Sequence, residues 1–311
     1  MKILVTGGAG FIGSHVSSKL IDLGHEVVVV DNLSTGKKSN IKKLLSNPKF
    51  QFYEKDILDL SPKDNLFSSV TAICHQAAIG SVPKSLKYPK NYHKVNTNGF
   101  FHILDIARLL HINRFVYASS SSIYGDNKDL PKIESKTGNP LSPYAVTKQI
   151  NELYAKTYFQ CYGIETIGLR YFNVFGPNQN PLGDYAAVIP KFIHLMNQLQ
   201  SPVINGNGDY SRDFTYIDNV VQANINALTT TNSLCFGENF NIGSGSTTTI
   251  LELFNLIKQY LNSQIKVNFG PIRKGDVPYS FADINKAKTY LNYNPTVNVA
   301  EGIKKLLKSI K

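Results

Sequence analysis

The chain is poor in cysteine and has no long hydrophobic run. Its 311 residues include three cysteines, Cys74, Cys161 and Cys235, which lie far apart in the sequence. This spacing fits neither a disulfide framework nor a metal site, and it predicts reduced thiols. No stretch reaches the roughly 18 consecutive apolar residues of a membrane-spanning helix. The first apolar segment starts at residue 2. We therefore expect no signal peptide, no membrane partner and a cytoplasmic location.

Charge is sparse and unbalanced. Charged residues make up 18% of the chain and hydrophobic residues 42%, which argues against a disordered protein. The net charge is +11, and much of it comes from lysines at positions 37, 38, 42, 43, 304, 305, 308 and 311. No nucleic-acid-binding motif accompanies them, so we predict a solvated positive surface that attracts an anionic nucleotide substrate. The seven histidines form no cluster with ligand spacing, and no metal is predicted.

A glycine-rich segment follows the first apolar run. Residues 2–6 are typical of a buried strand, and Gly7, Gly10 and Gly13 lead into a helical pattern. Such glycines let the backbone approach a pyrophosphate, which the free N–H groups at the start of the helix attract. Asp31 ends the next apolar strand, 18 residues after Gly13, where a carboxylate accepts hydrogen bonds from an adenosine ribose. The segment predicts a dinucleotide site that favours NAD over NADP.

A tyrosine and a lysine stand four residues apart in the segment SPYAVTK, residues 142–148. Ser142 and Pro143 fit the N-cap and first position of a helix, so Tyr144 and Lys148 share a helix face. A phenol ordinarily titrates near ~10, and a nearby cation favours the phenolate. We predict that Lys148 and a positively charged cofactor ring lower the pKa of Tyr144 and make it a general base.

Apolar strands and amphipathic helices alternate over the first half of the chain. The expected strands comprise residues 27–30, 50–54, 71–76, 114–118 and 164–171, and the expected helices comprise 91–110 and 143–161. This order predicts an α/β fold with a Rossmann-like doubly wound parallel sheet. Ligands bind at the carboxyl ends of such strands, so Ala77, Ser119 and Tyr171 should meet in one crevice. We predict an NAD-binding domain at 1–173 and a smaller, interleaved α/β substrate domain at 174–311.

These motifs resemble the extended short-chain dehydrogenases/reductases, in particular the NAD-dependent sugar-nucleotide epimerase family. The likeness runs from end to end and is carried by residues 6–13 (TGGAGFIG), Ser120 with Tyr144 and Lys148, 171–173 (YFN), 212–214 (RDF) and 273–276 (RKGD). Two further strings, residues 76–83 (QAAIGSVP) and 183–190 (GDYAAVIP), are similar to the bacterial UDP-N-acetylglucosamine 4-epimerases.

The resemblance implies C4 epimerisation of a UDP-sugar through a 4-keto intermediate, with NAD retained throughout. Tyr144 would take the proton of the 4-hydroxyl, Lys148 would also bind the nicotinamide ribose, and Ser120 would hydrogen-bond the 4-oxygen. The implied cofactor contacts are Gly7, Gly10, Phe11, Ile12, Gly13, Asp31, Asn32, Ser34, Thr35, Gly36, Asp56, Ile57, Gln76, Ala77, Ala78, Asn96, Ser119, Tyr144, Lys148 and Tyr171. The implied substrate contacts are Gly80, Ser81, Ser120, Ser121, Ser122, Tyr144, Asn173, Ala187, Val188, Ile204, Asn205, Gly206, Arg212, Arg273, Asp276 and Ser280.

Ser280 is the position that the resemblance links to specificity. A tyrosine at the matching place blocks an N-acetyl group on the sugar, whereas a serine leaves room, so a UDP-N-acetylhexosamine is the expected substrate. UDP-glucose and UDP-uronates remain alternatives, as do a 4,6-dehydratase, a UDP-uronate decarboxylase and a non-catalytic NAD sensor. The dehydratase is disfavoured because Ser121 and Ser122, rather than carboxylates, follow Ser120. The segments 91–110 and 143–161 are expected to pair with a second copy in a homodimer.

Overall fold

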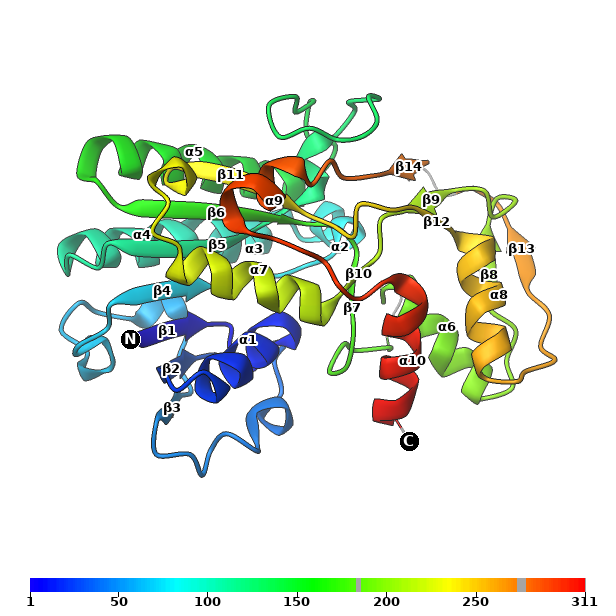
Figure 1. The fold of residues 1–311 in the computed structure, drawn as a ribbon, viewed down its shortest axis with the longest axis horizontal. Helices are drawn as coiled ribbons and strands as arrows, with labels where there is room; N and C mark the ends of the chain where they lie inside the picture. The colour runs from blue at the N-terminus through cyan, green and yellow to red at the C-terminus, as the bar shows by residue number, and fades with distance from the viewer. Residues whose placement is uncertain (183–185, 273–277, 311) are drawn as a thin grey trace.

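The computed structural model describes residues 1–182, 186–272 and 278–310, and a seven-stranded parallel sheet lies at its centre (Figure 1). From edge to edge its strands are β11 (Glu238–Ile242), β6 (Glu165–Tyr171), β5 (Arg114–Ser120), β4 (Ala72–His75), β1 (Lys2–Thr6), β2 (Glu26–Val30) and β3 (Phe50–Tyr53). The chain runs outward from β1 to β3, then returns to the other side of β1 and builds β4, β5 and β6. The strand order therefore reverses between β1 and β4, which is where such sheets bind ligands. The predicted fold class is confirmed.

The central strands are buried on both faces, which explains their continuous apolar sequence. Alternate residues enter two separate hydrophobic cores: Val5 and Val29 pack on one side, and Leu4 and Val28 on the other. Helices α1 (Phe11–Asp22) and α7 (Ile217–Thr229) cover the first side. Helices α4 (Gly99–Leu109) and α5 (Pro143–Tyr162) cover the second. The sheet is thus the middle of three layers.

The predicted helix at 91–110 consists of several pieces. Helix α3 (Pro89–Tyr92) passes through a π-helical turn, His93–Asn98, before α4 begins. π-Helical turns are rare and often occur at functional sites. The other short elements of this half are α2 (Val82–Lys87) and 3₁₀ turns at Lys38–Ile41, Ile57–Asp59, Asn65–Phe67 and Ser121–Tyr124. A further 3₁₀ turn, Ser233–Cys235, lies in the second half.

The second half of the chain forms small sheets of its own and also adds a strand and a helix to the central sheet. Its strands are β7 (Val174–Phe175) paired with β10 (Thr215–Tyr216), β8 (Val203–Asn205) paired with β13 (Asn268–Gly270), and the set β12 (Thr248–Thr249), β9 (Ser211–Arg212) and β14 (Tyr279–Ser280). Its helices are α6 (Val188–Asn197), α8 (Ile250–Tyr260), α9 (Asn285–Leu291) and α10 (Val299–Ile310). However, β11 pairs with β6 and α7 packs on the central sheet, so residues after 173 complete both its edge and its cover (Figure 1).

A loop between β5 and α5 ties the two halves together. Its residue Lys132 forms an isolated β-bridge with Ala282, just after β14. The Lys132 N–H donates to the carbonyl of Phe281 at 2.7 Å, and the Asp283 N–H donates to the carbonyl of Lys132 at 2.9 Å. The segment that leads to Tyr144 is thereby fixed to the segment that follows Ser280.

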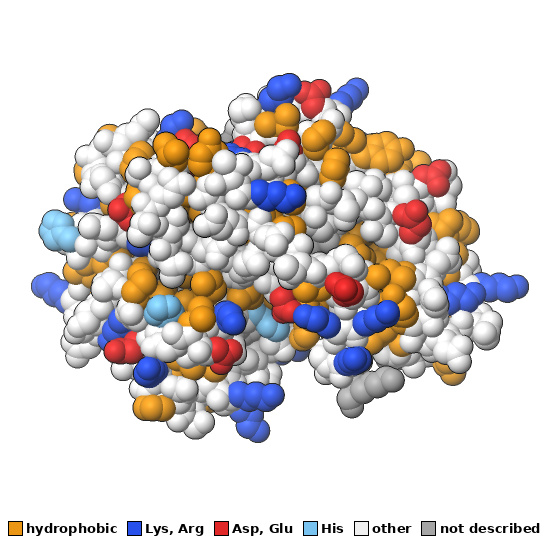
Figure 2. All heavy atoms as spheres, viewed as in Figure 1, with side chains coloured by type: hydrophobic (Ala, Val, Ile, Leu, Met, Phe, Trp, Pro, Cys, Tyr) orange, Lys and Arg blue, Asp and Glu red, His pale blue; other side chains and the backbone are white. Residues whose placement is uncertain are grey.

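None of the helices within the described residues is long and apolar enough to cross a membrane. On the face seen in Figure 2, lysine and arginine side chains are scattered rather than gathered in one patch.

Candidate active site

A pocket of about 360 Å³ opens at the carboxyl ends of the central strands. Most of the residues assigned to the cofactor line it: Gly7, Gly10, Phe11, Ile12, Gly13, Asp31, Asn32, Ser34, Thr35, Asp56, Ile57, Gln76, Ala77, Ala78, Ser119, Tyr144, Lys148 and Tyr171. Gly36 and Asn96 are not among its lining residues. The structure therefore brings together residues from the ends of the central strands and from α1 and α5, at the point where the strand order reverses.

The glycine-rich turn at one end of the pocket has no space for side chains. Gly7 has φ +67°, and a Cβ there would lie 2.7 Å from the backbone of Ala77. A Cβ on Gly13 would overlap the carbonyl oxygen of Gly7. Helix α1 starts directly after Gly10, and no side chain caps its first turn. Its N-terminal N–H groups and partial positive charge are therefore available to an anionic group.

Asp31 braces this turn as well as facing the pocket. Its carboxylate accepts the Ala9 N–H at 3.0 Å and the Leu33 N–H at 2.8 Å. Burial raises the pKa of Asp31, and these backbone hydrogen bonds oppose the rise. Gly36 packs behind it, because a Cβ at Gly36 would lie 2.9 Å from both carboxylate oxygens. Gly36 thus supports Asp31 instead of lining the pocket.

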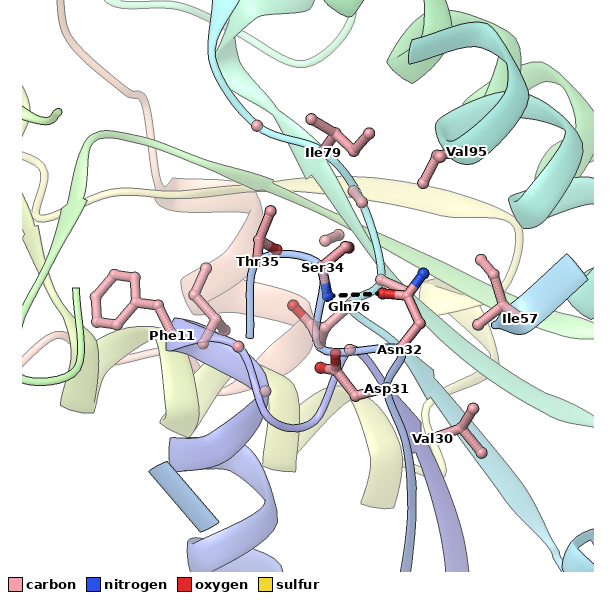
Figure 3. A pocket seen from close by; sticks show the side chains of 18 of the residues that line it. Phe11, Val30, Asp31, Asn32, Ser34, Thr35, Ile57, Gln76, Ile79 and Val95 are labelled. Atoms are coloured by element: carbon pink, nitrogen blue, oxygen red, sulfur yellow. Dashed lines mark hydrogen bonds between the residues drawn. The ribbon is translucent and has the colours of Figure 1, made fainter. Parts of the chain in front are cut away.

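The polar residues after β2 form a hydrogen-bonded rim (Figure 3). The side-chain amide of Asn32 donates to Asp56 at 2.8 Å, and its oxygen accepts the Ser34 N–H at 3.0 Å. Each oxygen of Asp56 and Asn32 keeps a further lone pair for a ribose or adenine donor.

Sequence reasoning missed several lining residues, namely Val30, Lys37, Asn40, Lys55, Ile79, Val95, Ala118, Asn178 and Asn180. Asn178 and Asn180 come from the second half of the chain, and no local pattern indicated that this half reaches the glycine turn. Contacts fix it there: the Asn178 amide donates to Ser14 at 3.3 Å, and His15 hydrogen-bonds the carbonyl of Pro177 at 3.0 Å. Asn40, whose side chain donates to the carbonyl of Ala9 at 2.8 Å, likewise carried no signal in the sequence.

Tyr144 and Lys148 lie in the first two turns of α5, as their spacing predicted. The Ser142 hydroxyl caps the helix by accepting the Ala145 N–H at 3.2 Å. The Lys148 side chain is buried, its Nζ donates to the carbonyl of Ala118 at 2.7 Å, and it lies 5.9 Å from the centre of the Tyr144 ring. A hydrogen bond joins Tyr144 to Ser120 at the end of β5.

Burial dominates the electrostatics of this pair. It raises the pKa of Tyr144, and the hydrogen bond with Ser120 only partly offsets this effect. The Lys148 ammonium faces the Ala118 carbonyl and the Tyr144 ring, and burial lowers the pKa of Lys148 to about 8. The predicted fall in the pKa of Tyr144 requires a positively charged cofactor ring as well as Lys148, and it stays a prediction.

A buried polar cluster underlies the pocket between β4 and β6. The Gln76 amide donates to Asn224 at 2.9 Å and to the Tyr171 hydroxyl at 3.1 Å. Asn224 of α7 is fully buried and donates to the same hydroxyl at 2.9 Å. Helix α7, which covers the face of the sheet opposite α5, therefore orients two residues of the pocket, Gln76 and Tyr171.

Asn96 has a supporting position. It lies in the π-helical turn, where its side chain accepts the Ile79 N–H at 2.8 Å and donates to the Ile79 carbonyl at 3.0 Å. It fixes the loop from Gln76 to Ser81, whose last residue has φ +87°. Tyr92, one turn earlier, donates to the carbonyl of Gly80 and meets the Tyr144 ring edge-on at 6.3 Å.

The residues assigned to the substrate are spread over both halves. Gly80 and Tyr144 line the pocket, and Ser120, Ser121 and Ser122 form the end of β5 and the turn after it. Ala187 and Val188 start α6, which no side chain caps, and Ile204, Asn205 and Gly206 lie at β8 and just after it. Asn173 donates to the carbonyl of Asp213 at 3.1 Å. Arg212 and Ser280 are register partners on β9 and β14, and both are half-buried. Arg273 and Asp276 lie outside the described residues.

The sequence profile of the NAD dependent epimerase/dehydratase family matches residues 3–243. The chain belongs to this family. The resemblance read from the sequence is thus confirmed, and so is the prediction of NAD as the cofactor on which the family depends. The residues around the pocket fit this cofactor: the glycine turn and uncapped α1 suit its pyrophosphate, and Asp31, Asn32 and Asp56 suit its adenosine.

Solved structures of relatives cover the whole chain. A UDP-glucose 4-epimerase of Thermotoga maritima, solved with UDP-glucose, is 38% identical with a TM-score of 0.93, over 100% of this chain and 98% of that one. A UDP-N-acetylglucosamine 4-epimerase of Methanobrevibacter ruminantium, in complex with UDP-N-acetylmuramic acid, is 35% identical with a TM-score of 0.94, over 99% and 97%. A UDP-glucuronic acid 4-epimerase of Bacillus cereus, with UDP-glucuronic acid and NAD, is 34% identical with a TM-score of 0.91, over 100% of both chains.

The glycine turn predicts the behaviour of a single variant. In Gly13→Ala the new Cβ would overlap the Gly7 carbonyl, so the turn must open and the start of α1 must move. We expect the purified variant to lose most of its bound NAD, measured by the ratio of absorbance at 260 and 280 nm. Lys19→Ala, at an exposed position of the same helix, is the matched control and should keep its NAD. Full retention by Gly13→Ala would contradict the assignment of this turn to the pyrophosphate.

Proposed function

We propose that this protein is an NAD-dependent UDP-sugar 4-epimerase that acts on UDP-N-acetylhexosamines and interconverts their gluco and galacto forms. The observation that carries the proposal is the contact of Ser120, Tyr144 and Lys148 at one end of the nucleotide pocket. The three solved relatives described above are all UDP-sugar 4-epimerases, which supports the reaction type. Because they differ in the sugar named for each, the sugar is argued from this chain's own residues.

Each catalytic side chain has a distinct role in this proposal. NAD, when bound, would supply the acceptor of the hydride from C4 of the sugar and the donor that returns it to the opposite face, together with a positive charge that favours the Tyr144 phenolate. Tyr144 accepts the proton of the sugar 4-hydroxyl and later returns it to the 4-oxygen. Ser120 hydrogen-bonds Tyr144 and orients the same oxygen. Lys148 binds the ribose of the cofactor and keeps a positive charge near the phenol, which favours the phenolate.

The N-acetyl preference rests on Ser280. This residue is small and half-buried, and it pairs with Arg212, for which we propose a role at the substrate diphosphate. The Asp213 N–H donates to the Ser280 carbonyl at 2.8 Å, which fixes β14 beside β9. A small side chain at this place leaves room for a substituent at C2 of the sugar.

Two alternative functions have less support. A 4,6-dehydratase needs an acid and a base beside the sugar, yet the first carboxylate after Ser120 is Asp126. That carboxylate accepts the Asn139 N–H at 2.8 Å and its side-chain amide at 2.9 Å, and its side chain is exposed. A non-catalytic NAD sensor has no need of a serine, tyrosine and lysine in mutual contact.

We also propose the division of labour between the two halves and a homodimer. Residues 1–173 would bind NAD and residues 174–311 the UDP-sugar, with β11 and α7 shared. The outer faces of α4 and α5 expose large apolar side chains, including Phe101, Leu153 and Tyr154, and the rings of Phe101 and Tyr154 lie 5.0 Å apart. An apolar face on two neighbouring helices suits self-association with a second copy.

The reaction itself is tested by an NMR time course of the purified protein with UDP-N-acetylglucosamine and, separately, UDP-glucose, without added NAD. We expect the galacto N-acetyl product to appear. Tyr144→Phe should lower the rate by about 10²-fold or more, because the general base is lost, while the protein still retains NAD. Tyr162→Phe, at the exposed end of the same helix, is the control. Loss of water from the substrate would favour the dehydratase. No reaction of either substrate, even with added NAD, would overturn the UDP-N-acetylhexosamine assignment and would favour a UDP-uronate, a dehydratase substrate or the NAD sensor.

The role of Ser280 is tested by Ser280→Tyr. The larger side chain should remove the space for the acetamido group, so we expect turnover of UDP-N-acetylglucosamine to fall by at least about tenfold, a loss of ~1.4 kcal/mol in binding at the transition state. Turnover of UDP-glucose, if the wild type shows any, should be preserved. An unchanged rate with the N-acetylated sugar would show that Ser280 does not set specificity.

The homodimer is tested by Leu153→Lys and multi-angle light scattering. A charge in the centre of the α4–α5 face should convert the dimer to a monomer, because an unpaired ammonium is costly to bury in an apolar interface. Leu199→Lys is the matched control, since Leu199 is 85% exposed in the turn after α6. A wild-type protein that is monomeric at all concentrations would refute the proposal.

A further inference from the structure

A buried ion pair lies behind the catalytic helix, and neither partner lines the pocket. Glu152 of α5 and Arg170 of β6 meet through two hydrogen bonds of 2.9 and 2.8 Å, and their side chains are 9% and 5% exposed. Burying two charges is expensive, and replacing such a pair with apolar residues is often neutral or stabilising. A contribution to stability is therefore a weak explanation for this ion pair, and a role in the reaction is the alternative.

The pair belongs to a repeated contact between β5 and α5. Tyr144, Lys148 and Glu152 are spaced by four residues and so occupy one face of the helix. Three successive residues at the end of β5 hold them: the Ala118 carbonyl accepts from Lys148 at 2.7 Å, the Ser119 hydroxyl donates to Glu152 at 2.5 Å, and Ser120 hydrogen-bonds Tyr144.

Arg170 is held on its other side as well. One guanidinium nitrogen donates to the Tyr124 hydroxyl at 3.0 Å and to the Glu134 carbonyl at 2.9 Å. The Tyr124 hydroxyl in turn donates to Asn241 of β11 at 2.6 Å. The guanidinium is thus fixed facing Glu152, in bidentate contact with its carboxylate.

We propose that Glu152 is a positioning residue for the reaction, which fixes the end of β5 on α5 and whose negative charge keeps the buried Lys148 protonated. Arg170 keeps Glu152 in place. This inference rests on the proposed function, because it gives Glu152 a role through Lys148 and Tyr144.

The electrostatics of Lys148 agree with this role. Burial lowers the pKa of Lys148 to about 8, and Glu152 is the group that opposes the fall. The other titratable groups around the pair are Tyr144 on α5, His75 on β4, Tyr117 on β5 and Arg170 on β6. Burial lowers the pKa of His75 to about 3 and raises that of Tyr117, so both are neutral near pH 7. Removal of the Glu152 charge therefore lowers the pKa of Lys148 further, and Lys148 loses its proton at a lower pH.

The test compares Glu152→Gln with two controls. The first is the double variant Glu152→Gln, Arg170→Gln, which removes both charges and avoids an unpaired guanidinium. The second is Glu165→Gln, which breaks the 2.7 Å ion pair between Glu165 and Arg114. These two residues lie at the starts of β6 and β5, the ends of the strands away from Lys148. For each variant we would measure kcat against pH with the UDP-sugar. The ¹³Cε NMR titration of Lys148 in lysine-labelled protein, assigned with Lys148→Met, reports on the ammonium independently of turnover.

We expect the alkaline limb of kcat and the NMR titration of Lys148 to move to lower pH in Glu152→Gln. If the pKa of Lys148 falls by ~1 unit, activity should fall by about fivefold at about pH 8 but by much less at about pH 6.5, following the protonated fraction of Lys148. The double variant should show the same shift, because it also lacks the Glu152 charge, whereas Glu165→Gln should match the wild type. The inference would be overturned if Lys148 titrated at the same pH in Glu152→Gln as in the wild type. It would also be overturned if the variant lost the same fraction of activity at every pH. A wild type that performs no epimerisation would overturn the proposed function instead, and the NMR titration would still test the charge coupling.

Discussion

The burial of one positive charge is the constraint on which this site depends. The Lys148 side chain is buried between its own helix, α5, and the end of the sheet, where an ammonium loses most of its hydration. The protein compensates with the carbonyl of Ala118 and the carboxylate of Glu152, both fixed by the contact of β5 with α5. The parallel sheet makes this possible, because it delivers the ends of neighbouring strands to the same edge. The geometry of the pocket and the protonation state of its lysine thus have a common structural origin.

The local motifs of the sequence were enough to predict the central sheet except its edge strand β11, and to indicate much of the pocket. The glycine turn, Asp31 and the spacing of Tyr144 and Lys148 are short-range signals, since each reflects a backbone conformation or a single helix face. These short-range signals did not show how deeply each side chain is buried or which groups surround it. Burial raises the pKa of Tyr144, and the sequence motif did not show how deeply this side chain is buried. Similarly, the sequence did not show that the Asn96 side chain holds the Ile79 backbone.

Long-range contacts account for most of what the sequence did not reveal. Asn224 orients Gln76 and Tyr171 from α7, a helix that was expected to belong to the substrate half. Its amphipathic pattern predicts a helix but does not say which sheet the helix covers. Glu152 had a visible spacing, eight residues after Tyr144, yet a glutamate on a helix is usually solvated, and Arg170 on the neighbouring strand completes the pair in space. The substrate side is also divided among short strands whose pairing depends on residues far apart in sequence.

The late return of the chain to its first sheet has a consequence for biosynthesis. When a ribosome has released residues 1–173, the sheet still lacks its edge strand β11, and the face that α7 covers is still exposed. Asn224, which holds Gln76 and Tyr171 together, has also not yet been made. The nucleotide pocket is thus completed only after about three quarters of the chain has left the exit tunnel, which gives folding a strongly non-local step late in synthesis.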